Sequence, residues 1–150
     1  MGKVCDQVIR YKRKFPGSII WWRYKKHAKV VENHLNPGEI PMYSFAAQMN
    51  DNPFDLFSTA VLCMTNRRLL VGQDHIIGGY TLKSITPDLF NDLTVYRGFV
   101  WGKITIDTLK EEVIFTNVEK KALREIETAI TTGMMEEKKE YGSLNSRSKK

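Results

Sequence analysis

The chain contains 150 residues and carries a formal net charge of +6, with 42% hydrophobic and 27% charged residues. This length is typical of one domain, and a chain of this size buries about 70% of its unfolded surface, so its core needs neither disulfides nor a structural metal. The only cysteines, Cys5 and Cys63, lie in unrelated contexts, which indicates a reducing compartment rather than a disulfide framework. No run approaches the ~18 apolar residues of a membrane span and no signal peptide is recognisable, so a cytoplasmic protein is expected.

The positive charge is concentrated at the N-terminus. Residues 1–35 contain nine basic and two acidic residues, whereas residues 36–150 contain 14 basic and 15 acidic residues. The sequence therefore divides into a basic N-terminal extension (1–35), an almost neutral body (36–135) and a charged tail (136–150). The polar composition after Tyr141 predicts disorder in that tail.

Two amphipathic helices are predicted in the basic extension. Apolar side chains recur at helical spacing within residues 3–15, and Pro16-Gly17 ends the pattern. Ser18 is a favourable N-cap for a second helix over about residues 19–35, which the Asn-Pro-Gly sequence at 36–38 ends. The first apolar stripe comprises Val4, Val8, Tyr11 and Phe15, and the second comprises Ile20, Tyr24, Ala28, Val31 and Leu35.

From Glu39 onward the apolar residues recur with a period of two, which indicates β-strands. The predicted centre of the sheet is a hairpin over residues 57–72, with a turn at Thr65-Asn66 in which Asn66 tolerates unusual backbone angles. Cys63 lies in its first apolar run and is expected to be buried. Further strands are predicted near residues 75–82, with a bend at Gly78-Gly79, and near 89–96, 100–107 and 112–115, with Val100 on the apolar face.

A capping box at Thr116–Glu119 predicts the start of a C-terminal helix. One face of this helix comprises Ala122, Leu123, Ile126, Ile130 and Met134. The order of two helices, about seven short strands and one helix predicts an α+β domain built on an antiparallel barrel or sandwich, with the late helix covering one open end or face of the sheet.

Four segments of the chain resemble a known family: LNPGE at residues 35–39, AVLCMTNRRLLVG at 60–72, ITPDLFNDLTV at 85–95 and WGKITIDT at 101–108. On these residues the chain resembles the bacterial pleckstrin-homology-like (PH-like), or YokE-like, family. The resemblance implies a seven-stranded antiparallel barrel or sandwich capped by a C-terminal helix, to which the N-terminal helices are added. The family has no established common activity, so the resemblance specifies the fold rather than the function.

One departure from the wider PH superfold concerns lipid recognition. Members that bind phosphoinositides use Lys and Arg in and around the loop between their first two strands. Here that loop, residues 50–55, contains two acids and no base. An inositol phosphate would meet the wrong charge there, so specific phosphoinositide binding is not expected.

The sequence predicts no catalytic, cofactor or metal site. His27 and His34 are two helical turns, or about 10.5 Å, apart, too far to ligate one metal ion together, and His75 is expected in a turn. No serine or cysteine lies in a nucleophile motif, and no glycine-rich phosphate loop precedes a helix. We therefore expect a protein that is not an enzyme.

The sharpest functional candidate is the basic, aromatic surface of the N-terminal helices, which suits an anionic membrane. The alternative is that both helices pack their apolar stripes on the sheet and leave the bases in water. Exposure of Trp21 and Trp22 would favour the membrane. Nucleic-acid binding is disfavoured, because the strands show no paired exposed aromatic residues within a basic face. The candidate residues are Arg10, Lys12, Arg13, Lys14, Trp21, Trp22, Arg23, Lys25, Lys26 and Lys29.

Arg67 and Arg68 form a second candidate, as contacts for an anion, although charges directly after a turn usually begin an exposed strand. The function predicted first is a non-catalytic interaction module that binds another protein or a second copy of itself, by an edge strand or a helical face. The alternative is peripheral binding to an anionic membrane through residues 3–29.

Overall fold

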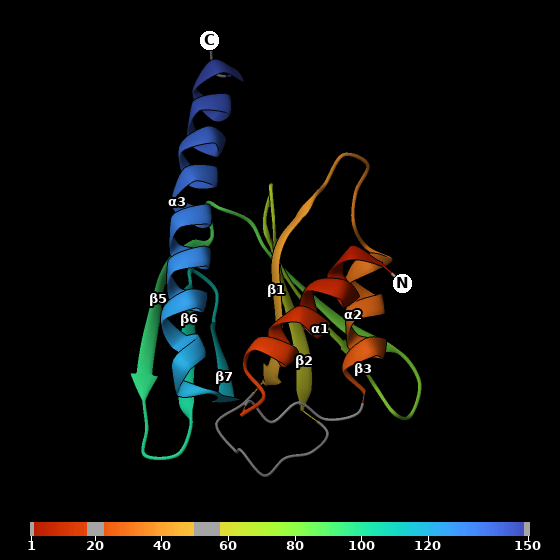
Figure 1. Ribbon diagram of the computed structural model, residues 1–150. Helices are drawn as coiled ribbons and strands as arrows, with labels where there is room; N and C mark the ends of the chain where they lie inside the picture. Colours follow the sequence, from red (N-terminus) through yellow and green to blue (C-terminus); the bar gives the residue numbers. More distant parts are fainter. Residues whose placement is uncertain (1, 18–22, 50–57, 149–150) are drawn as a thin grey trace.

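The computed structural model describes residues 2–17, 23–49 and 58–148. Two helices come first, seven strands follow, and a short 3-10 turn leads into the last helix (Figure 1). The helices are α1 (Lys3–Lys14), α2 (Tyr24–Glu32) and α3 (Leu123–Ser148), and the 3-10 turn is Lys120–Ala122. The strands are β1 (Pro41–Gln48), β2 (Thr59–Thr65), β3 (Leu69–Asp74), β4 (Tyr80–Ile85), β5 (Phe90–Arg97), β6 (Gly102–Thr108) and β7 (Glu112–Val118).

The described strands form one antiparallel sheet in the order β4-β3-β2-β1-β7-β6-β5. The sheet has two halves, because β1 meets β7 at one described pair, Gln48 opposite Thr116, whereas the strands within each half pair over most of their length. This architecture confirms the predicted α+β fold with seven antiparallel strands, a C-terminal helix and N-terminal helices.

The larger core lies between the sheet and α3. The face predicted for the last helix is fully used, because Ala122, Leu123, Ile126, Ile130 and Met134 are all buried. They join inward-facing strand residues, among them Phe45, Leu62, Ile104 and Phe115. In β6, buried and half-buried positions alternate, as the period of two predicts.

A second core lies on the opposite face of the sheet, where α1 and α2 pack on β1, β2 and β3. It contains Val4 and Val8 from α1, Ala28 and Val31 from α2, and Cys63 from the sheet. Every residue of β2 is buried, because helices cover both of its faces, and this explains its uncharged sequence. A Cβ on Gly72 would lie 2.7 Å from Val31 Cγ2, so glycine is what allows α2 to approach β3 so closely.

Several predicted boundaries are wrong. α2 begins at Tyr24 and ends at Glu32, so His34 lies beyond the helix and shares no face with His27. The predicted cap Ser18 and stripe residue Ile20 lie outside the described residues. The capping box is also wrong: Thr116 and Asn117 continue β7, because Thr116 pairs with Gln48, and the helical turns begin only at Lys120.

The C-terminal tail differs from the predicted disorder. α3 continues to Ser148, and its last turns extend beyond the sheet (Figure 1). Residues 136–141 contain no proline and are mostly Glu and Lys, which favour helix, whereas the helical signal is absent from the Gly-, Ser- and Asn-containing sequence of residues 142–148.

Candidate functional site

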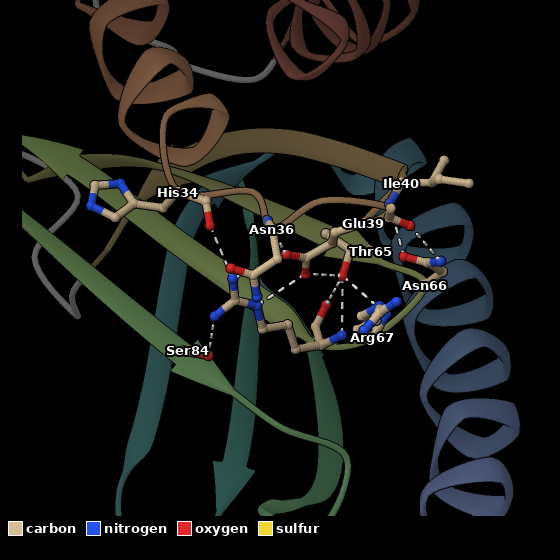
Figure 2. A network of polar contacts seen from close by, with 10 residues as sticks. His34, Asn36, Glu39, Ile40, Thr65, Asn66, Arg67 and Ser84 are labelled. Atoms are coloured by element: carbon tan, nitrogen blue, oxygen red, sulfur yellow. Dashed lines mark hydrogen bonds and ion pairs between the residues drawn. The ribbon is translucent and has the colours of Figure 1, made fainter.

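Two of the segments that carry the family resemblance meet at one corner of the sheet (Figure 2). Glu39, from LNPGE, has a side chain with no exposed surface, and it is held by Arg68, from TNRRL. Arg68 donates from Nε to Oε2 and from a terminal nitrogen to Oε1, both at 3.0 Å. The Thr65 hydroxyl donates to Oε2 at 2.6 Å and the Asn36 N–H donates to Oε1 at 3.0 Å. We call this group of four residues the Glu39–Arg68 corner.

The protonation state of Glu39 follows from these contacts. Burial alone would raise the pKa of this carboxyl, but the hydrogen bonds from Arg68, Thr65 and Asn36 outweigh burial and hold the pKa below its usual value. Glu39 is therefore ionised at neutral pH, and its charge is balanced inside the protein.

Arg68 has little capacity left for an external anion. Besides Glu39, its guanidinium donates to the Ser84 hydroxyl and to the His34 carbonyl, each at 3.0 Å, and its side chain is 18% exposed. Arg67 is exposed and borders a cavity of about 590 Å³, but Glu137 and Glu140 line the same cavity. An anion at Arg67 would therefore meet two carboxylates, so this geometry gives the predicted anion contact no support.

The hairpin turn between β2 and β3 is organised by Thr65 rather than by unusual backbone angles at Asn66. The Thr65 hydroxyl accepts the N–H groups of Arg67 and Arg68, both at 3.1 Å. Asn66 instead fixes the start of β1, because its side-chain oxygen accepts the Ile40 N–H at 2.8 Å. Among the described non-glycine residues, positive φ occurs at Asn117 and not at Asn66.

The predicted basic surface is divided over two helices whose apolar stripes face the sheet. The α1 residues Arg10, Lys12, Arg13 and Lys14 and the α2 residues Lys25, Lys26 and Lys29 are exposed. Arg23 pairs with Asp74, and its side chain is 10% exposed. Trp21 and Trp22 lie outside the described residues.

Packing of these stripes removes one way of binding a membrane. An amphipathic helix lies in a bilayer interface with its apolar face down. In α1 and α2 that face is already buried, with Val4, Val8, Ala28 and Val31 at 0% exposure. Only the charged faces remain available, and Lys14 is paired with Glu125.

Exposed apolar side chains occur instead at the turn between β5 and β6, which the sequence patterns did not single out. Phe99 is 96% exposed and Val100 is 60% exposed. The Gly98 N–H donates to the Trp101 carbonyl at 3.1 Å and closes the turn, so Val100 is not an inward-facing strand residue as predicted. We call Gly98–Trp101 the β5–β6 tip.

Basic residues from several elements surround the β5–β6 tip. Lys120 donates to the Phe99 carbonyl, and its ammonium lies 5.9 Å from the Phe99 ring centroid. Arg97, Lys120 and Lys121 border a cavity of about 420 Å³ beside Val100 and Trp101, to which Glu119 adds one carboxylate. An adjoining hollow of about 650 Å³ is lined by Lys121 and Arg124 and by Lys14, which is paired there with Glu125. We call Arg97, Lys120 and Lys121 the basic rim.

The histidines have structural positions. His27 is 2% exposed, and its Nδ1 accepts the Asp74 N–H at 2.8 Å. Burial, with the nearby Arg23 charge, lowers the pKa of His27 to about 4, so the ring is neutral at pH 7. Among the described residues, no group of three or more His, Cys, Asp or Glu side chains is placed to hold a metal ion.

An antiparallel sheet of this strand order, with a C-terminal helix packed on it, is a PH-like α+β fold. The family model described as "Bacterial PH domain" matches residues 35–132, well over half of the chain. The chain therefore belongs to the bacterial PH domain family, with α1 and α2 preceding the matched region. No curated protein matches it. None of the described helices combines the length and the apolarity needed to cross a membrane.

Proposed function

We propose that this bacterial PH domain is a non-catalytic module that docks reversibly on an anionic membrane surface through the β5–β6 tip and its basic rim. The observation that carries the proposal is the position of Phe99, 96% exposed, with the Lys120 ammonium beside its ring. The contact differs from the membrane contact through residues 3–29 that is the alternative predicted from the sequence, since α1 and α2 contribute charge but no apolar face.

The chemistry of the tip suits an interface between water and lipid. Phe99 and Val100 have little protein around them, so transfer into the acyl region would bury surface that is now in water. Arg97 and Lys121 are exposed beside them, and basic side chains are attracted to anionic headgroups by about 1 kcal/mol each. The tip and its rim together supply on the order of 4–5 kcal/mol, which corresponds to a weak, salt-sensitive contact.

A protein partner or a second copy of the chain is the second candidate. It is favoured by β4, which is an edge strand of the described sheet and carries Tyr80 with 55% exposure. The C-terminal half of β4 is less accessible to a partner strand, because Lys83 pairs with Glu111 of the β6–β7 turn. This leaves a short edge, and a short edge gives few backbone hydrogen bonds for strand addition.

Co-sedimentation with vesicles tests the proposal. The variant Phe99→Ser/Val100→Ser removes the apolar tip without changing the charge. Leu109→Ser is the matched control, because Leu109 is 71% exposed in the turn between β6 and β7. We expect the chain and the control to pellet with phosphatidylglycerol vesicles at low salt, and the tip variant to bind about tenfold more weakly. Equal pelleting of all three, or none by the unaltered chain, would overturn the proposal, and concentration-dependent dimers in light scattering would favour the second candidate.

A further inference from the structure

A second exposed apolar turn lies between β3 and β4. Ile77 is 94% exposed and Ile76 is 50% exposed. The turn is closed by the His75 N–H, which donates to the Gly79 carbonyl at 3.0 Å. Gly78 and Gly79 have φ values of +63° and +80°, which glycine adopts without strain, and their surroundings are open. We call Ile76–Gly79 the β3–β4 tip, and it contains no charged residue.

The first turn of α2 lies beside this second tip. Arg23, just before α2, pairs with Asp74 at the end of β3, so the first turn of α2 is fixed beside the tip and the Asp74 charge is balanced. Lys26 follows in that helical turn and is exposed, whereas Lys25 borders a separate hollow with Gly2, Cys5 and Glu32. The β3–β4 tip therefore resembles the β5–β6 tip in its exposed apolar turn, and Lys26 is an exposed cation in the adjoining first turn of α2.

The pairing of the strands places both tips at the same end of the sheet. Asp74 of β3 pairs with Tyr80 of β4, and the β3–β4 tip lies directly beyond this pair. The neighbouring end of β2 is its start, where Thr59 pairs with Gln48 of β1. Gln48 in turn pairs with Thr116 near the end of β7, and Val118 pairs with Gly102 next to the β5–β6 tip. In Figure 1 the β5–β6 turn lies at the lower left and the β3–β4 turn at the lower right, both in the half of the molecule away from the C-terminus of α3.

We infer that the β3–β4 tip is a second insertion point, so that the domain stands on an anionic phospholipid bilayer with both tips in the lipid and the β2–β3 turn facing away. This inference rests on the proposed function, because it adds a second contact to the same membrane surface. Two contacts explain how a module whose single tip binds weakly can be held in one orientation, since the second contact forms at a high effective concentration.

The test is a fluorescent probe on the turn itself. Ile77→Cys is labelled under native conditions with an environment-sensitive dye, and Leu109→Cys, at the other end of the sheet, is the control position. The native thiols, Cys5 and Cys63, are buried, so the unaltered chain should take up little dye, which is checked first. With phosphatidylglycerol vesicles we expect a blue-shifted emission and quenching by nitroxide lipids at position 77, and no change at position 109.

The failures of the two proposals are distinguishable. If position 77 stays in water while pelleting still depends on Phe99, the second insertion point is wrong and the proposed function survives. If nothing pellets, both fail. A shift at position 77 that follows protein concentration without vesicles would overturn the inference in favour of contact between copies. As a label-free measurement, Ile76→Ser/Ile77→Ser should weaken vesicle binding about tenfold, and unchanged binding would also contradict the inference.

Discussion

The two ends of the sheet use charged residues in opposite ways. At the Glu39–Arg68 corner a carboxylate with no exposed surface is held by four hydrogen bonds from three residues, and Arg68 also binds Ser84 and His34. At the other end Arg23 is also paired, with Asp74, but Arg97 and Lys121 are exposed beside the β5–β6 tip. A charge that is fully paired inside the protein serves the architecture, whereas exposed charge next to exposed apolar surface is available to a partner.

The largest expected effect is a loss of stability at the Glu39–Arg68 corner. Arg68→Ala leaves the buried Glu39 carboxylate without its cation, which should lower the free energy of unfolding by about 3–5 kcal/mol. Urea denaturation followed by circular dichroism measures this change. Arg67→Ala is the neighbouring control and should stay within about 0.5 kcal/mol, because Arg67 is exposed. Equal effects at both positions would mean that the corner is not a structural anchor.

Acid should destabilise the fold through His27. Its pKa is lowered from 6.5 to about 4 in the folded protein, so between these values the unfolded chain binds more protons. Stability is therefore lost as the pH falls from 6.5 toward 4, by about 3 kcal/mol over the window. Glu39, with its lowered pKa, adds to the loss only once the pH falls below the ordinary value of a glutamate, 4.5, and does so down to the folded pKa of that carboxyl. A series of urea denaturations from pH 7.5 to about 4.5 measures the slope, and His27→Gln should flatten it. An unchanged slope in that variant would assign the acid sensitivity to other groups.

A smaller effect is expected where α2 approaches β3. In Gly72→Ala the new methyl group would lie 2.7 Å from Val31 Cγ2 and 3.1 Å from the His27 carbonyl oxygen. Relieving this contact requires α2 to move, so we expect a loss of about 1–3 kcal/mol in the free energy of unfolding. The same denaturation assay measures it. A neutral or stabilising result would show that α2 adjusts without cost.

The smallest effect on stability is expected at the exposed end, with a clear effect on binding. Lys120→Gln/Lys121→Gln should leave the free energy of unfolding within about 0.5 kcal/mol, because surface charges contribute little. Vesicle binding should fall about ten- to thirtyfold, from the loss of two cations near an anionic surface. Lys110→Gln, on the exposed turn between β6 and β7, is the control and should bind as the unaltered chain does. Loss of binding in the control as well would indicate attraction by net charge alone.

The sequence predicted the parts of this molecule that depend on periodic burial. The alternation in β6 and the apolar face of α3 depend on local spacing, and both are confirmed. The TNRRL turn also carried the family resemblance, but its role required a contact with Glu39, 29 residues away from Arg68, which no local pattern indicates.

The exposed tips were missed for a related reason. Phe99 and Ile77 belong to residue types that are usually buried. Only the pairing register of the neighbouring strands shows that they lie in exposed turns. The basic helices became a candidate because of their charge. Their apolar stripes pack on the sheet, which is the alternative to membrane binding predicted from the sequence. The capping box failed because pairing of Thr116 with Gln48 keeps that segment in β7.

The central claim, that one end of the sheet meets the membrane while the other supports the fold, is tested most directly by amide hydrogen exchange with and without phosphatidylglycerol vesicles. We predict slower exchange at residues 75–79 and 97–101 when vesicles are present, and no change at residues 65–68. Protection at residues 65–68, or unchanged exchange at both tips in a sample that pellets with vesicles, would contradict the account.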